Sequence, residues 1–168
     1  MKRILALAVS ALAFAAPSMA QNSINDVIAL LKGDNAITCN YSYALKGDFP
    51  LKSSGNALLH KHKYYLNENG LETYCDGSTV WTVDRKAKEV LVSKSEGSIV
   101  SRLEDFEDIT ISRYTGKTLS CTLKNEAQGI NIDFSAENIS ISRAPEDSSA
   151  FIFDTSQLGS DWIITDLR

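Results

Sequence analysis

Apolar and polar residues alternate along most of this chain, and a period of two is the pattern of a β-strand with one buried face. Between Ile37 and Leu45, one side carries Ile, Cys, Tyr, Tyr and Leu, while the other carries Thr, Asn, Ser and Ala. Similar segments recur about every eight to twelve residues, and turn-forming pairs such as Asn69-Gly70 and Asp76-Gly77 separate them. The pattern predicts an antiparallel meander.

The number of such segments limits the architectures that the chain can adopt. About ten strands are predicted, and a flat sheet of that width would expose one apolar face. Three arrangements bury that face: a sandwich, a closed barrel, or an open half-barrel with a helix over its mouth. Strand-like segments occur at 37–45, 51–60, 64–66, 71–75, 79–83, 89–93, 109–111, 119–123, 130–134, 139–141, 151–153 and 162–164.

Two segments have the spacing of a helix instead. After a possible cap at Asn22-Ser23, apolar residues at Ile24, Val27, Ile28 and Leu31 predict a short amphipathic helix that ends at Gly33. In residues 95–107, apolar residues fall three to four positions apart among Ser, Arg, Asp and Glu. We expect a short helix or an ordered loop in this second segment.

The first twenty residues have the layout of a secretory signal peptide. Lys2 and Arg3 precede an apolar run over residues 4–16, Pro17 follows, and Ser18-Met19-Ala20 supplies small residues for a peptidase. The run is shorter than the ~20 residues needed to span a bilayer. We therefore expect cleavage after Ala20 and a soluble mature domain, not embedded in a membrane, that is located in the periplasm.

The charge of the mature chain argues against a nucleic-acid partner. The sequence has 17 basic and 21 acidic residues, and removing Lys2 and Arg3 leaves 15 basic residues, a net charge of −6. Nucleic-acid binding relies on clustered Lys and Arg, and an acidic chain lacks that surplus. Residues 21–168 have the length of one domain, which we expect to be a monomer.

The three cysteines, Cys39, Cys75 and Cys121, leave two possibilities open. An oxidising compartment allows at most one internal disulfide with one thiol left over, and three buried thiols are the alternative. Neither the cysteine spacing nor the pair His60 and His62 completes a metal-binding set. We expect no metal and no other cofactor.

No catalytic motif occurs in the sequence. There is no Gly-x-Ser-x-Gly turn for a serine nucleophile and no Gly-rich loop that would hold a phosphate. A cysteine nucleophile paired with a histidine has no local signature here. The expectation is a protein that is not an enzyme.

One stretch resembles a known family. Residues 55–66 (GNALLHKHKYYL), 74–84 (YCDGSTVWTVD) and 89–92 (EVLV) are similar in order and content to the outer-membrane lipoprotein carrier family, the LolA-like proteins. That family has a Gly-x-Leu strand, a basic stretch and then a D-G-x-T-x-W hairpin, and the segment 150–153 (AFIF) resembles its C-terminal strand. In the basic stretch, Lys61 stands at the family's basic position and His62 stands where the family has proline.

The resemblance implies a half-open antiparallel β-barrel whose helices form a lid over an apolar cavity. It also implies a carrier that receives lipoprotein acyl chains from an inner-membrane release complex and passes them to an outer-membrane acceptor. Lys61 becomes a candidate latch for the lid. From the strand alternation we expect the cavity and lid to be lined by Tyr43, Leu58, Trp81, Val83, Leu91, Ile99, Leu103, Phe106 and Phe153.

An alternative function uses the same scaffold. A cell-envelope interaction or sensor domain would bind a protein partner across its sheet or at its edges, without taking up a lipid. The two hypotheses differ in whether the apolar face of the sheet is a binding surface.

Overall fold

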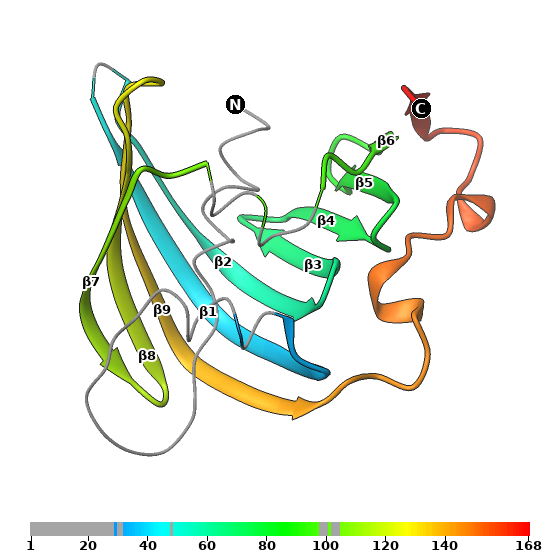
Figure 1. The fold of residues 1–168 in the computed structure, drawn as a ribbon. Helices are drawn as coiled ribbons and strands as arrows, with labels where there is room; N and C mark the ends of the chain where they lie inside the picture. The colour runs from blue at the N-terminus through cyan, green and yellow to red at the C-terminus, as the bar shows by residue number, and fades with distance from the viewer. Residues whose placement is uncertain (1–28, 30–31, 48, 98–100, 102–104) are drawn as a thin grey trace.

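Ten strands form one mixed sheet in the computed structural model, which describes residues 29, 32–47, 49–97, 101 and 105–168 (Figure 1). This confirms the mainly β prediction. The expected signal peptide, nearly all of the predicted 22–33 helix, and Ile99 and Leu103 lie outside the described residues. The strands are β1 (Asn35–Lys46), β2 (Leu51–His60), β3 (Lys63–Glu68), β4 (Leu71–Cys75), β5 (Thr79–Asp84), β6 (Glu89–Lys94), β7 (Asp108–Thr115), β8 (Thr118–Asn125), β9 (Ile130–Arg143) and β10 (Ile163–Asp166).

The sheet is open at both sides. Its strands follow the order β10-β6-β5-β4-β3-β2-β1-β9-β8-β7, so β10 and β7 are the edges and the sheet does not close into a barrel. Every neighbouring pair is antiparallel except β10 and β6, which run parallel. Figure 1 shows the sheet bending strongly, with the C-terminal segment running along its convex side.

Two tight turns have the backbone geometry that their residues favour. Asn69 (φ 52°) and Gly70 (φ 88°) form the two-residue loop between the paired residues Glu68 and Leu71, as expected for an Asn-Gly hairpin. Lys61 and His62 form the equivalent loop between β2 and β3, with Lys61 at φ 55°. His60 is therefore the last residue of β2, and His62 lies in the turn.

A bulge joins two segments that were predicted as separate strands. Residues 130–134 and 139–141 belong to the single strand β9. Opposite Thr38 and Asn40 of β1, the partner residues step from Ser140 to Glu137, so β9 contains one extra residue. Asn138 has a positive φ of 54° at this point. Such a bulge bends a strand and shifts its alternation by one position.

The C-terminal segment differs from the prediction. Residues 151–153 were expected to form a strand, but Ser149–Phe151 form a short 3-10 helix (η1), and a second one (η2) spans Thr155–Gln157. Phe151 is 1% exposed and Phe153 is 9% exposed. This segment therefore buries its aromatic residues by packing against the sheet instead of extending it.

Among the described residues, no helix has both the length and the apolar character needed to cross a bilayer.

Candidate functional site

One face of the sheet carries a large, continuous apolar cluster, which we call the inner face. Its side chains come from six strands on both sides of β1, and most are at most 5% exposed. Burying each such side chain stabilises the fold by about 1.5–3 kcal/mol. The buried members are Ile37, Cys39, Tyr41, Tyr43, Ala57, Leu59, Tyr64, Leu66, Cys75, Phe106, Leu119, Cys121, Leu123, Ile132, Phe134, Ala136 and Ile139.

The strand register explains why these residues share a face. Residues that lie directly opposite one another in antiparallel strands project their side chains to the same side. One such row crosses six strands, from β9 through β1 to β5. Its members, each paired with the next, are Ile141, Ile37, Leu59, Tyr64, Cys75 and Val80.

Three of the residues predicted to line a cavity belong to this face. Tyr43 and Phe106 are buried members of the inner cluster. Leu91 lies opposite Thr82 in a second row that continues through Thr73, Leu66 and Ala57 to Cys39. Leu91 is only half-buried, so its side chain is accessible for a binding test.

Four other predicted residues lie on the opposite, outer face, which corrects the expected single lining. Leu58 pairs with Tyr65, and Trp81 lies between Tyr74 and Val92. Val83, which is fully buried, packs with Phe153 in a separate cluster. The outer side of β5 carries Trp81 and Val83 because the C-terminal segment covers it, and alternation alone does not identify which side faces inward.

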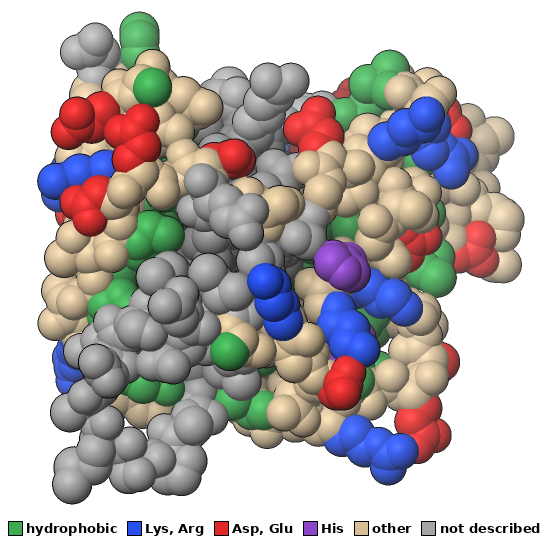
Figure 2. All heavy atoms as spheres, viewed as in Figure 1, with side chains coloured by type: hydrophobic (Ala, Val, Ile, Leu, Met, Phe, Trp, Pro, Cys, Tyr) green, Lys and Arg blue, Asp and Glu red, His purple; other side chains and the backbone are tan. Residues whose placement is uncertain are grey.

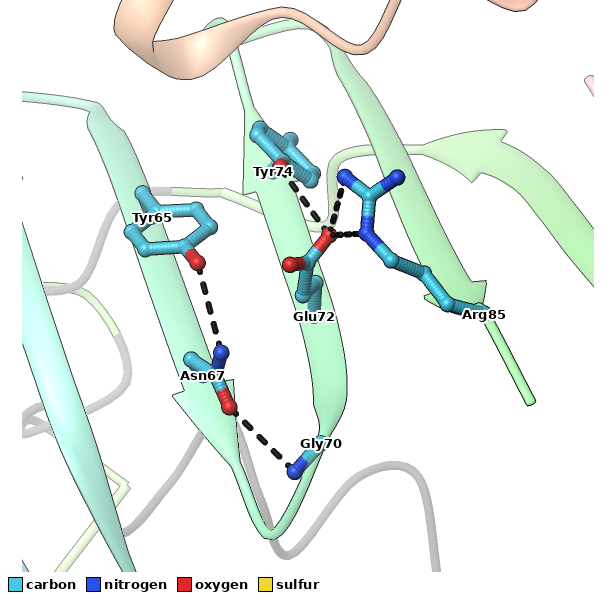
Figure 3. A network of polar contacts seen from close by, with 6 residues as sticks. All are labelled: Tyr65, Asn67, Gly70, Glu72, Tyr74 and Arg85. Carbon is cyan, nitrogen blue, oxygen red and sulfur yellow. Dashed lines mark hydrogen bonds and ion pairs between the residues drawn. The ribbon is translucent and has the colours of Figure 1, made fainter. Parts of the chain in front are cut away.

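The outer face around β3–β5 also has a polar network (Figure 3). Tyr74 Oη donates to Glu72 Oε2 at 3.0 Å, and Arg85 Nε donates to the same oxygen at 2.9 Å. The Arg85 guanidinium also lies 5.6 Å from the centre of the Phe153 ring. Burial and the neighbouring Glu72 raise the pKa of Tyr74 to about 12. This network holds the C-terminal segment against the strands.

The segment His60–Lys63 forms a basic corner at the β2–β3 turn. Because the chain has only two histidines, the purple atoms in Figure 2 mark this corner, with Lys and Arg side chains beside them. The candidate latch Lys61 is exposed, and its Nζ lies 2.5 Å from Asp34 Oδ1. This ammonium group lowers the pKa of Asp34. Lys63 Nζ donates to Ser148 Oγ at 2.6 Å, which ties the turn to the C-terminal segment.

Sequence reasoning missed a buried carboxylate on the inner face. Glu68 is 9% exposed and accepts hydrogen bonds from Tyr41 Oη at 3.0 Å and Tyr43 Oη at 3.1 Å. Burial, followed by the nearby Glu68, raises the pKa of both tyrosines, that of Tyr43 to about 12. A signal was present, because Glu68 continues the inward alternation of Tyr64 and Leu66.

All three cysteines are buried free thiols on the inner face. Of the two possibilities that the sequence left open, the structure has the three thiols. Burial raises the pKa of Cys39 and of Cys121 to about 12 and also raises that of Cys75. These thiols are protonated at neutral pH, and a thiol is a poor nucleophile and a poor metal ligand in that form. Within the described part of the chain, no three metal-binding side chains come together.

An open polar depression of about 450 Å³ lies at the end of β1, β2 and β9. Ser42, Ser54 and Ser135 form a row across it by register, and Lys52 and Asp133 flank them. Asp133 is paired with Lys46 at 2.7 Å, which lowers the pKa of the carboxyl group. This depression is open to solvent, and Tyr43 of the inner face is one of its lining residues, so the depression adjoins that face.

Comparison with known proteins gives a structural likeness only. No protein-family model and no curated protein sequence matches the chain. A crystal structure of an uncharacterized conserved protein from Thermus thermophilus is similar, with a TM-score of 0.50 at 6% sequence identity. The likeness covers 86% of this chain and 99% of that chain. At this level of identity the likeness supports the fold and carries no information on function.

Proposed function

We propose that this protein is a periplasmic carrier that shields the acyl chains of lipoproteins, or of a similar lipid, on the inner face of a half-open sheet. The observation that carries the proposal is the inner face itself, a continuous cluster of apolar side chains on one face of a sheet whose two edges do not meet. The signal-like first twenty residues and the resemblance of residues 55–92 to LolA-like carriers support the same function.

The physical basis of such a carrier is apolar burial. Each methylene group removed from water contributes about 0.8 kcal/mol, so one acyl chain of ordinary length supplies the affinity for tight binding. A carrier also has to release its cargo, and an open sheet gives the chain a route out that a closed barrel lacks. In this proposal, the lid is the one that the family resemblance implies, and Lys61 is its latch.

Two leucines on opposite faces provide a matched test. Leu91 lies on the inner face and Leu58 on the outer face, and both are half-buried. Binding of a fluorescent apolar probe, and its displacement by an acylated peptide, would be measured for the unmodified protein and for Leu91→Gln and Leu58→Gln. We expect about tenfold weaker binding for Leu91→Gln and at most a twofold change for Leu58→Gln.

Two results would contradict the proposal. If neither the probe nor the acylated peptide binds the unmodified protein, the carrier function is wrong. If Leu58→Gln weakens binding more than Leu91→Gln, the cargo lies on the outer face and the assignment of faces to functions is wrong.

The second candidate, an envelope interaction domain, is favoured by strand β10. This strand is a sheet edge, and Ile163 and Ile164 are 60% and 47% exposed. Exposed apolar edge strands pair readily with an extended segment of another chain. Crosslinking that captures a stable protein partner, and that Ile164→Lys abolishes while probe binding is unchanged, would favour this function.

A further inference from the structure

The inner face contains one polar spot that its apolar surroundings do not explain. Glu68 lies at the end of β3, where β1 and β2 continue beyond the β3–β4 hairpin. Its two carboxylate oxygens each accept one phenolic hydrogen bond, from Tyr41 and Tyr43. An ionised carboxylate offers about four acceptor sites, so two hydrogen bonds leave acceptor capacity unused.

No cation neutralises this carboxylate within the described part of the protein. The lysines and arginines there that form ion pairs do so with other carboxylates. A buried carboxylate is costly unless it is paired, and phenolic hydrogen bonds supply only part of the compensation. The site is therefore suited to a positively charged group that arrives from outside.

A second buried polar group, Thr73, lies on the far side of Glu68 from the two tyrosines. Thr73 is 6% exposed, and its Oγ1 has no hydrogen-bond partner. Leu66 lies opposite Thr73, and Leu71 lies opposite Glu68, so Thr73 and Glu68 are diagonal neighbours on the inner face. Glu68 accepts its hydrogen bonds from Tyr41 and Tyr43, which lie in the opposite direction across β2, so its carboxylate is turned away from Thr73.

The glycine beside this spot preserves its geometry. Gly55 lies opposite both Tyr41 and Glu68. A Cβ at this position would lie 2.9 Å from Tyr41 Oη and 2.2 Å from the carbonyl oxygen of Asn67. A side chain here would displace the tyrosine that holds the carboxylate.

We propose that Glu68 binds the protonated amine of an amphiphilic ligand whose apolar part lies on the inner face. The carboxylate accepts hydrogen bonds from the ammonium group, and the Tyr41 and Tyr43 hydroxyls fix the carboxylate. This inference deepens the carrier function and rests on it. Two sources supply the chemistry: the free amino terminus of a diacylated lipopeptide, or the ethanolamine headgroup of a phospholipid.

A pair of probes that differ only in charge tests the proposal. Dodecylamine is cationic at pH 7.5, and N-dodecylacetamide has the same chain without the charge. Their displacement of a fluorescent apolar probe from the full-length protein would be compared. We expect dodecylamine to displace the probe at a concentration at least tenfold lower than N-dodecylacetamide does. Glu68→Gln should reduce the ratio of the two effective concentrations to below three.

A matched control separates the site from general electrostatics. Glu72 is the carboxylate of the outer face, on the neighbouring strand, and Glu72→Gln removes the same charge. In the Glu72→Gln variant, we expect the ratio of the two effective concentrations to be the same as in the unmodified protein. A diacylated lipopeptide with and without an N-acetyl group, and phosphatidylethanolamine against phosphatidylglycerol, then identify the source of the amine.

The outcomes distinguish this inference from the function on which it rests. If both dodecyl compounds bind the unmodified protein equally well, the amine site is wrong while the carrier function stands. If neither compound binds, the carrier function fails and the amine site fails with it. The comparison within the unmodified protein needs no variant, so it remains decisive even if Glu68→Gln does not fold.

Discussion

Gly55 leaves the space that the Tyr41 hydroxyl occupies on the inner face. Tyr41 uses that space to donate its hydrogen bond to Glu68 at 3.0 Å. Gly55 and Tyr41 lie directly opposite each other in β2 and β1. The polar spot among the apolar side chains therefore depends on the absence of a single methyl group.

We expect Gly55→Ala to destabilise the protein by about 1–3 kcal/mol, because the added methyl group overpacks a filled site. Its Cβ would lie 2.2 Å from a backbone oxygen, which cannot move aside as a side chain can. The free energy of unfolding in urea measures the effect. Ser54→Ala, on the exposed outer side of the same strand, is the control and should change it by less than about 0.5 kcal/mol. Equal stability of the two variants would contradict the close approach.

The bulge at Asn138 determines which side chains of β9 face inward. Without the bulge, the extra residue would turn Ile139 and Ile141 toward the outer face, whereas deleting Asn138 removes that residue and leaves both isoleucines on the inner face with Ala136. We expect the deletion variant to retain cooperative unfolding, as measured by near-UV circular dichroism during heating. Asn138→Gly keeps the extra residue and suits the positive φ, so it should remain within about 0.5 kcal/mol of the unmodified protein. A deletion variant that loses cooperative unfolding would contradict this role of the bulge.

The C-terminal segment is anchored by buried aromatic residues. Phe151 is 1% exposed, while its neighbour Ile152 is 42% exposed. We expect Phe151→Ala to cost about 3–5 kcal/mol, because it leaves a cavity in the packing between this segment and the sheet. Ile152→Ala should cost less than about 1 kcal/mol. Urea unfolding of both variants provides the comparison, and a similar cost for the two would show that the segment is not packed as described.

The buried thiols of the inner face should make the folded protein less stable at alkaline pH. The pKa values of Cys39 and Cys121 are raised from 9.0 to about 12, by burial. A raised pKa in the folded state contributes stability that is fully present below pH 9 and is lost as the pH rises toward 12. We expect the free energy of unfolding to decrease over this range.

The double variant Cys39→Ala and Cys121→Ala isolates the contribution of the thiols. Its stability at pH 8 will be lower than that of the unmodified protein because two core side chains are smaller. The free energy of unfolding that this variant loses between pH 9 and pH 11 should nevertheless be smaller than the loss in the unmodified protein. An equal loss in both proteins would mean that the thiols do not cause the alkaline instability.

Local patterns were enough to predict most of the strands. The boundaries of Leu51–His60 and Leu71–Cys75 were predicted as observed, because both strands end at turn residues that the sequence displays. The Asn69-Gly70 turn was predicted for the same reason. The bulge at Asn138 was missed, because a one-residue shift in alternation is indistinguishable from a loop between two short strands.

The face of each strand was harder to predict than the strand itself. Val80 and Trp81 are adjacent apolar residues in β5, and their side chains point to opposite faces. Which of the two faces inward depends on what covers each side of the sheet. The C-terminal segment provides the outer cover, and its packing is a long-range contact with no local signature. Glu68 was overlooked because an acidic residue beside Asn-Gly is typical of a solvated turn, whereas here it continues a buried face.

The most direct test of the central claim is to locate the cargo on the protein. A lipopeptide with a photoreactive diazirine on its acyl chain would be bound, irradiated and mapped by mass spectrometry of the digested protein. A carrier that uses the inner face will be labelled at inner-face positions such as Leu91, Val80 and Phe134, and not at the outer-face residues Leu58 and Trp81. Labels confined to the outer face or to β10 would contradict this function.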